Sequence, residues 1–436
     1  MTWLQRYRIR HYVSSSIWIL PCLGMAGAVG VARLLHWIEG EMGWESAFDA
    51  DTARAVLGTM ASAMFTFVVF VSSALLVAVQ LASSQLTPRI IAIVFKDPVT
   101  KFSLTVFAFT FTFTLGVLVQ IKTSVHLLTA NVAAYSCLAS LGVFLYLVDH
   151  VGRALRPSGA LWGVASLGRA VIESVYPRHL GELQSKSLAA APLPDGEPAT
   201  IVPSGRDGVV LAFDIPGIVS LAQRADCVIE MVPQVGDFIA DGDPLFRIFQ
   251  GEASLPADAL CQMVAVGQER TLEQDPAFAF RIMVDIASKG LSPAINDPTT
   301  AVLALDQIHH LLRSVGSRRL DDGQVCDAGG RLRLVYRTPD WDDLVRLAVT
   351  EIRQFGGTSI QVARRLRAML ENLIQTLPEE RTALLRQELE RLHRSAERFF
   401  TDPEDRALAE ISDFQGVGGK HGPSQPDRQV KEATLP

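Results

Sequence analysis

The chain has 436 residues, of which 49% are hydrophobic, and its formal net charge is −6. This length allows two or three structural units, at roughly 100–200 residues for each domain. A negative charge without a clustered basic face gives no sign of a nucleic-acid surface, so we expect no nucleic acid among its partners. The hydrophobic residues are unevenly distributed, because residues 16–151 carry most of the excess.

The cysteines are scattered along the chain and form neither a CxxC pair nor the Cys/His spacing of a metal site. They are Cys22, Cys137, Cys227, Cys261 and Cys326. Two of them fall in apolar segments, where a free thiol behaves as a small hydrophobic side chain. The sequence therefore predicts no disulfide framework and no zinc site, and nothing else in it indicates a cofactor.

Four segments of the first third of the chain are long and apolar enough to cross a membrane. A transmembrane helix needs about 20 predominantly apolar residues to cross a hydrocarbon layer of about 30 Å. The predicted spans are residues 16–37, 55–82, 102–121 and 127–148. We therefore expect a transmembrane domain over residues 1–151, with the lipid bilayer as its main partner.

Positive charges at the ends of the apolar segments predict how the domain is oriented. The flank before the first span contains Arg6, Arg8 and Arg10, whereas the loop after that span is acidic. Arg153 and Arg156 follow the fourth span. Because basic residues are retained on the cytoplasmic side, this pattern predicts a multi-pass protein of the cell inner membrane with both termini in the cytoplasm.

The first apolar segment also has some features of a cleaved signal peptide. A basic flank, an apolar run and the small residues Ala26-Gly27-Ala28 loosely match such a segment. The apolar run continues to Ile38, however, which is longer than a typical signal core. We therefore expect the first span to be retained.

The second predicted span carries an unusual row of polar side chains. At about 100° per residue, six of them fall within an arc of roughly 60° on the helix. They are Thr59, Ser62, Thr66, Ser73, Gln80 and Ser84. Such a row is typical of a seam between helices, where small hydroxyl residues allow close approach. It is also typical of the wall of a hydrated pore, to which several subunits contribute. The span contains no charged residue, which argues against a proton relay.

Short β-prone runs follow a predicted juxtamembrane helix and linker at residues 152–199. Val209–Phe213, Val228–Val232 and Leu245–Phe249 are bounded by Gly, Pro and Asp, which is typical of strands. We expect a β-rich, barrel-like module over residues 200–255, with a helical turn inserted at residues 218–223.

The turn around Val235-Gly236-Asp237 resembles the turn-and-strand pattern of biotinyl and lipoyl carriers. Those carriers modify a lysine in a hairpin, and this chain has no lysine between Lys186 and Lys289. The residues therefore exclude covalent carriage of a cofactor and leave a compact β-module.

The remainder of the chain is predicted to be a mostly helical cytoplasmic domain over residues 256–414, arranged as a helical bundle. Asp275, Asp297 and Asp402 each precede a proline, as expected for an N-cap followed by the first helical residue. Residues 331–336 have the pattern of a strand. The Gly-rich and polar residues 415–436 predict a disordered tail.

One connection in this domain combines two prolines with several capping side chains. Its candidate residues are Ser292, Asn296, Asp297, Thr299 and Thr300. The pattern favours a rigid turn between two helices. The alternative is a small anion or ligand site, because backbone amides at a helix N-terminus can bind an anion.

Asp306, His309 and His310 share the next predicted helix and are residue types that bind metals. Adjacent histidines point about 100° apart on a helix, so these side chains do not easily join one metal site. We therefore predict a packing or surface role for them and no metal.

Three blocks together resemble the bacterial predicted-membrane-protein family called domain of unknown function 2254. They are Leu81–Arg89, Arg270–Pro276 and Leu291–Pro298. The resemblance extends over nearly the whole chain, to about residue 400. It implies an inner-membrane location and no established activity, so it supplies no catalytic residues and leaves the function open.

No ordered catalytic triad or paired-carboxylate frame is recognisable, so we predict no enzyme activity. The leading hypothesis is an oligomeric ion channel or permeation protein, in which the second span lines the path and the soluble region forms a vestibule or gate. The alternative is a non-conducting membrane sensor or assembly scaffold that binds a cytoplasmic protein partner. A homo-oligomer is expected in the first case.

Overall fold

The computed structural model describes residues 1–42, 50–89, 96–121, 127–180, 196–250, 255–320 and 323–418. Contacts divide the chain into two compact units. The first consists of residues 1–175, 183–282 and 321–338, and the second of residues 176–182, 283–320 and 339–436.

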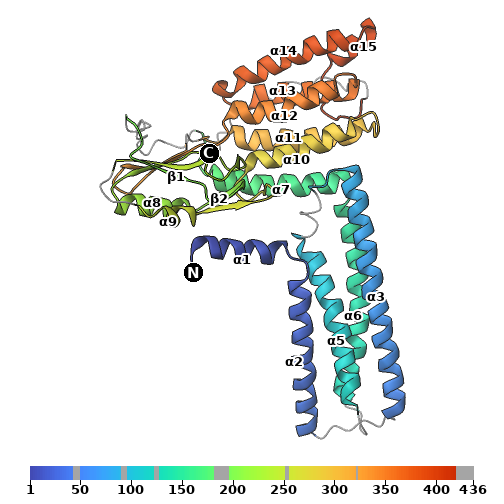
Figure 1. Cartoon of the computed structure of the whole chain (residues 1–436). Coiled ribbons are helices and arrows are strands. Elements are labelled where there is room, and N and C mark those ends of the chain that lie inside the picture. The colour runs from blue at the N-terminus through green and yellow to red at the C-terminus, as the bar shows by residue number, and fades with distance from the viewer. Residues whose placement is uncertain are drawn as a thin grey trace, which may run out of the picture. The chain divides into compact units, whose positions relative to one another are not determined.

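Four helices of the first unit are long and apolar enough to cross a membrane, as the sequence predicted. They are α2 (Ile19–Met42), α3 (Ala50–Gln85), α5 (Pro98–Gln120) and α6 (Leu127–Ala154). Figure 1 shows them running side by side. The α3 helix has 36 residues, which is well beyond the roughly 20 residues that a hydrocarbon layer requires.

The packing of these four helices is centred on α5, which contacts the other three. Phe107 and Phe113 of α5 are completely buried. The Phe107 ring meets Phe67 of α3 edge-on, with 5.1 Å between ring centroids. Thr110 of α5 and Ser140 of α6 share a buried hydrogen bond of 2.9 Å. Two of the alternating phenylalanines of α5, Phe107 and Phe113, therefore lie at the packed centre of the four helices.

The α6 helix receives its N-terminal cap from α2. Glu39 is 1% exposed, and its carboxylate accepts hydrogen bonds from the backbone amides of Leu128 (2.6 Å) and Thr129 (3.3 Å). The Thr129 hydroxyl also donates to this carboxylate. A negative charge at the start of a helix compensates for its unpaired amides and its dipole. The buried carboxylate thus links the end of one candidate span to the beginning of another.

The basic N-terminal flank is itself a helix, α1 (Trp3–Ser15), which the sequence analysis did not predict. Thr2 and Gln5 form a capping box at its start. Leu4 packs against Leu211 and Ala265 of the sheet region, while Trp3 and Tyr7 stack at a centroid distance of 5.2 Å. The absence of one dominant apolar stripe explains why the pattern did not reveal this helix.

The β-region of the first unit contains two sheets. Their strands are β1 (Thr200–Pro203), β2 (Gly208–Phe213), β3 (Val228–Met231), β4 (Phe238–Ile239), β5 (Pro244–Phe249), β6 (Val264–Gly267), β7 (Gln324–Cys326) and β8 (Leu332–Tyr336). One sheet has the order β1-β5-β3-β8-β7, and the other has the order β4-β2-β6. The three predicted strands and the predicted strand at residues 331–336 are confirmed, but the described strands do not close into a barrel.

The strands of the larger sheet come from distant parts of the chain. The β8 strand pairs with β3 in parallel, with Ile229 opposite Leu334, whereas the other pairs in this sheet are antiparallel. The α8 helix (Ile215–Arg224), predicted as a helical turn, packs against β3 and β8. Ile218, Ile229 and Phe246 are completely buried in the core that results. A short α9 (Ala257–Cys261) precedes β6.

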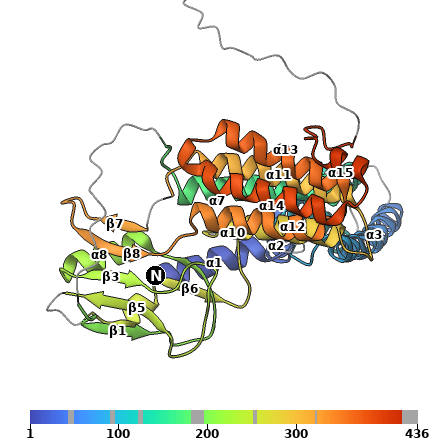
Figure 2. The same cartoon turned by 90° about the horizontal axis from the view of Figure 1, so that it is seen from above.

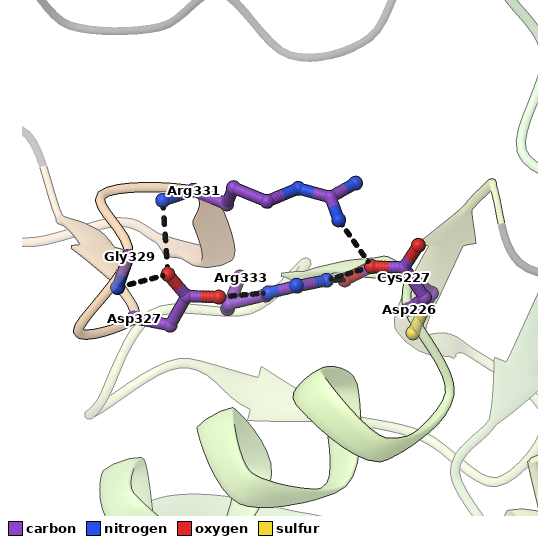
Figure 3. A network of polar contacts seen from close by, with 6 residues as sticks. All are labelled: Asp226, Cys227, Asp327, Gly329, Arg331 and Arg333. Atoms are coloured by element: carbon purple, nitrogen blue, oxygen red, sulfur yellow. Dashed lines mark hydrogen bonds and ion pairs between the residues drawn. The ribbon is translucent and has the colours of Figure 1, made fainter.

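A buried arginine fastens the β7–β8 hairpin to the start of β3 (Figure 3). Arg333 binds Asp327 at 2.7 Å and Asp226 at 2.8 Å, and its side chain is only 7% exposed. Arg331 also reaches Asp226 at 2.7 Å, but its side chain is 61% exposed. Hydrogen bonds from Arg333 hold the pKa values of Asp226 and Asp327 below their ordinary range.

The second unit consists of helices. One of them, α10 (Pro276–Gly290), begins in the first unit and ends in the second. The others are α11 (Pro298–Gly316), α12 (Trp341–Phe355), α13 (Ile360–Thr376), a short 3-10 turn (Glu379–Arg381), α14 (Thr382–Phe399) and α15 (Pro403–Ala409). Figure 2 shows α11, α13 and α14 alongside one another, in agreement with their contacts. A further helix, α7 (Pro157–Val175), follows the candidate spans in the first unit.

Hydrogen bonds hold residues 415–418 in the structure, in contrast to the disordered tail that the sequence predicts from residue 415. The Asp413 carboxylate accepts from the amides of Gly416 (2.9 Å) and Gly418 (2.7 Å). Arg364, which is 1% exposed, donates to the Gly418 carbonyl at 3.1 Å. The rest of the predicted tail, residues 419–436, lies outside the described residues.

Replacing Arg333 by Met should lower the thermal midpoint at which the β-sheet circular dichroism signal is lost at pH 7. The substitution leaves the largely buried Asp327 carboxylate without its cation. The matched variant Arg331→Met removes an exposed arginine from the same strand region and should change the midpoint little.

The effect of Arg333→Met should also depend on pH. Because the pKa values of both aspartates are lowered in the folded protein, their pairing contributes fully above an unfolded pKa of about 4. The contribution is lost as the pH falls through the lowered values. The difference between wild type and variant should therefore narrow in acid. An equal loss in both variants at pH 7 would contradict the assigned role of Arg333.

Candidate functional site

The six polar residues of α3, which we call the α3 stripe, all lie exposed on the surface of the single chain. Residues that α3 buries against its neighbours are Leu57, Ala61, Met64, Val71, Val79 and Ala82. At about 100° per residue, these two sets lie on opposite sides of the helix. The stripe is therefore not a seam within the described part of one chain, and it faces whatever surrounds that chain.

Most hydroxyls of the stripe are satisfied by the helix itself. Thr59 donates to the Ala55 carbonyl at 2.8 Å, and Ser73 donates to the Val69 carbonyl at 2.9 Å. Thr66 and Ser84 make similar bonds of 3.1 and 2.8 Å to preceding carbonyls. Such bonds let serine and threonine lie on an apolar-facing helix at little cost, and they leave the oxygen able to accept from a second group.

Gln80 differs from the hydroxyl residues of the stripe. Its side chain is exposed, and its amide makes no hydrogen bond within the described residues. A primary amide has two donors and an acceptor, so it cannot be satisfied by one backbone carbonyl. In hydrocarbon such a group is costly unless it meets water or another polar group. Gln80 is thus the residue of the stripe that most requires a partner outside the chain.

Two of the motif blocks singled out in the sequence meet at Phe278. The guanidinium of Arg89, which follows the end of α3, lies 5.4 Å from the centre of the Phe278 ring. The guanidinium of Arg270 lies 5.6 Å from the same ring. Burial and the neighbouring Arg281 and Arg270 lower the pKa of Arg89. Cation–π contacts from two arginines therefore connect the end of the stripe helix to the start of α10.

The start of α10 is fixed by Asp275. This side chain is 2% exposed, accepts a hydrogen bond from the Phe278 amide at 3.0 Å and pairs with Arg270 at 2.7 Å. Burial raises the pKa of Asp275, and Arg270 acts in the opposite direction. The carboxylate thus serves as the predicted N-cap and also holds the arginine that covers Phe278.

Gly236 is required where it approaches this pair. Its φ is +96°, and a Cβ placed there would lie 2.1 Å from a terminal nitrogen of Arg270 and 2.7 Å from a carboxylate oxygen of Asp275. Any side chain at this turn would displace the ion pair. The turn that resembles a carrier hairpin in sequence therefore supports a salt bridge in the structure.

The neighbouring residues of the same block attach α1 and the smaller sheet. Glu273 pairs with His11 of α1 at 2.9 Å, while Gln274 bonds both the amide (3.1 Å) and the carbonyl (3.3 Å) of Phe213. Burial alone would raise the pKa of Glu273, but the hydrogen bond from His11 and the nearby Tyr7 hydroxyl outweigh it and keep this pKa below its usual value. Burial and the Glu273 carboxylate raise the pKa of Tyr7.

The predicted turn at residues 292–300 uses its polar groups internally. Asp297 accepts from the amide (3.1 Å) and hydroxyl (2.6 Å) of Thr300, and its own amide donates to the Gly290 carbonyl at 2.7 Å. The Ser292 hydroxyl donates to the Lys289 carbonyl at 2.7 Å. Asn296 has a φ of +49°, which suits asparagine in a tight turn, and Thr299 is exposed. These contacts are those of a rigid connection.

Asp306 and His309 are drawn together by an arginine. Arg365 binds Asp306 at 2.7 Å and the His309 ring nitrogen Nδ1 at 3.2 Å, and the other ring nitrogen of His309 lies 2.9 Å from Asn372. Burial and Arg365 lower the pKa of His309. Among the described residues no group of three potential ligands is placed to hold a metal ion.

The fold and these contacts define a membrane protein with four apolar helices, followed by a mixed helical and sheet region. The family model described as "Predicted membrane protein (DUF2254)" matches residues 14–372, and the chain belongs to this family.

Relatives of the chain include uncharacterised mycobacterial proteins. One from Mycobacterium bovis and one from Mycobacterium tuberculosis (strain H37Rv) are each 28% identical to it over 425 residues, covering 93% of this chain and 80% of the relative. No solved structure matches the chain.

Sequence reasoning identified the α3 stripe and three motif blocks, two of which meet at Phe278, but it did not identify Phe278 itself. A lone phenylalanine in a helical pattern carries no signal of a cation–π contact. Its role depends on Arg89, which lies almost 190 positions earlier in the chain.

Replacing Glu273 by Gln should loosen α1. The neutral amide weakens the hydrogen bond to His11, which is worth about 1 kcal/mol at this partly exposed site, so hydrogen exchange over residues 3–15 should accelerate roughly fivefold. Glu269→Gln makes the same charge change at an exposed neighbouring position and should leave this exchange unchanged. Identical exchange in wild type and Glu273→Gln would refute the attachment.

Proposed function

We propose that this protein is the subunit of an oligomeric ion channel or permeation protein of the inner membrane, in which the α3 stripe lines the path. The observation that carries this proposal is the exposure of the stripe on the side of α3 opposite its buried face. Facing lipid, the unsatisfied amide of Gln80 is the unfavourable group of the stripe, whereas around a shared axis the polar side chains face water or one another.

The spacing of the stripe suits contact between copies of α3. Thr59, Thr66, Ser73 and Gln80 repeat at intervals of seven residues, which keeps one edge of a helix in register with a neighbour. Small hydroxyl side chains allow such helices to approach closely. The stripe contains no charged side chain, so the proposed path is weakly selective.

The proposal places both termini in the cytoplasm and assigns the sheet and helical regions to a vestibule or gate. The Arg89–Phe278 contact supports a gating role, since it attaches the end of α3 to the start of α10. A movement of α10 is then transmitted to the helix that lines the path. Only a short stretch of backbone separates Gln85, the last residue of α3, from Arg89, so the Arg89 side chain cannot move far without moving the end of α3.

A non-conducting sensor or assembly scaffold is the second candidate. This scaffold role is favoured by the hydroxyl groups of the α3 stripe, which already donate to backbone carbonyls of α3. A helix whose hydroxyls are satisfied in this way can pack against another copy without water between them. In this case the soluble region binds a cytoplasmic protein, and no solute crosses.

Measuring ion flux into liposomes that contain the purified protein distinguishes the channel from the non-conducting scaffold. Ser73→Leu and Thr66→Leu place branched apolar side chains on the stripe and should reduce flux by at least about tenfold, because a pore wall loses its polar groups. Ser72→Leu makes the same chemical change at an exposed position about 100° away on the helix and should leave the flux within about twofold of wild type.

Robust flux that is unaffected by Ser73→Leu and Thr66→Leu would remove the stripe from the path. Absence of flux under voltage, osmotic and pH stimuli, in a protein that still forms oligomers, would favour the scaffold.

A further inference from the structure

The α1 helix has two faces with different neighbours. Residues Trp3, Leu4, Tyr7 and His11 lie on the face that meets the sheet region. On the opposite face, at spacings of three and four residues, are Ile9, Tyr12 and Val13. Their side chains are 53%, 56% and 43% exposed. A helix of 13 residues thus presents a second, largely exposed apolar strip, in which the Tyr12 ring meets the Trp18 ring edge-on.

The strip lies close to the predicted membrane boundary. The α1 helix ends at Ser15 and the candidate span α2 begins at Ile19, so the connection can extend only about 14 Å. In addition, Lys101 in the first turn of α5 is 4% exposed and donates to the Ser14 carbonyl. The C-terminal end of α1 is therefore fixed beside the ends of two candidate spans.

Basic side chains border the strip on both sides. At about 100° per residue, Arg8 lies along one edge of the strip, and Arg6 and Arg10 lie along the other. All three are exposed. Long basic side chains beside an apolar strip are typical of helices that lie in a membrane interface, where the stems rest on hydrocarbon and the charged ends reach the headgroups.

A pocket of about 390 Å³ continues the strip toward the spans. Its lining combines the ammonium-bearing side chains of Lys96 and Lys101 with the apolar Val13, Leu20 and Phe102. Trp18, just before α2, is 53% exposed. Tryptophan and tyrosine concentrate at membrane interfaces, and cationic groups over apolar walls match a phosphate headgroup above its acyl chains.

We infer that the outward face of α1 is a binding surface for anionic phospholipid. Ile9, Tyr12 and Val13 enter the headgroup layer, while Arg6, Arg8, Arg10 and Lys96 contact lipid phosphates. The partner is a bilayer rather than another protein because the strip is continuous with the candidate spans and its charges are of one sign. Since Glu273 holds the other face of α1, this helix joins the lipid surface to the sheet region.

Photocrosslinking of the full chain tests this surface directly. Benzoylphenylalanine is placed at Ile9 or at Val13, in protein reconstituted into vesicles of phosphatidylcholine with a minority of phosphatidylglycerol. The matched control is the same group at Tyr7, on the face that meets the sheet. Adducts are identified by mass spectrometry. A second set of the same benzoylphenylalanine variants also carries the substitutions Arg6→Gln, Arg8→Gln and Arg10→Gln.

Positions 9 and 13 should yield phospholipid adducts, and position 7 should yield adducts within the protein. Phosphatidylglycerol should be enriched at least about twofold over its share of the vesicle, and the three arginine substitutions or high salt should abolish that enrichment. Adducts only to protein at positions 9 and 13 would overturn the proposal. Lipid adducts without enrichment would overturn the assignment of an anionic partner.

Discussion

The hydrocarbon layer cannot solvate polar groups, and this constraint gives the α3 stripe its meaning. The helix buries a face of Leu, Ala, Met and Val against its neighbours and leaves its polar face outward. In a water-soluble protein this arrangement would be ordinary. In a candidate transmembrane helix it leaves the amide of Gln80 in particular in need of water or a polar partner, and the proposed oligomer rests on this need.

The remainder of the first unit connects this helix to the sheet region through a short series of contacts. Arg89 follows α3 and lies over Phe278, whose amide is bound by Asp275. The adjacent Gln274 bonds to β2, and Glu273 bonds to α1. Consecutive residues of one block therefore hold three different elements. This explains physically why such a short stretch is distinctive in sequence although it contains no catalytic group.

Local patterns predicted what depends on local chemistry. Turn residues, capping side chains and long apolar runs act on their immediate neighbours. The sequence therefore predicted the strands β2, β3 and β5, the N-caps Asp275 and Asp297, and the four apolar helices. The positions of the polar residues on α3 followed from the helical period alone. Their exposure did not, since it depends on which faces α2, α5 and α6 cover.

The sequence could not predict which strands and side chains pair when they lie far apart in the chain. The β8 strand joins β3 in parallel across a separation of about one hundred residues, so the proposed barrel-like module became two open sheets. The buried Arg333 that secures this pairing looked like an ordinary charged residue in a strand. Likewise α1 was read as a basic flank, because its apolar residues are divided between two faces.

The central claim, that the α3 stripe faces another copy of α3 across a shared axis, is tested most directly by disulfide crosslinking in native membranes. In a background with Cys22→Ala and Cys137→Ala, Ser73→Cys and Ser72→Cys place a thiol at adjacent positions on different sides of the helix. Oxidation should convert the Ser73→Cys protein, but not the Ser72→Cys protein, into a covalent dimer. Equal crosslinking of the two variants, or none at position 73, would contradict a shared axis lined by the α3 stripe.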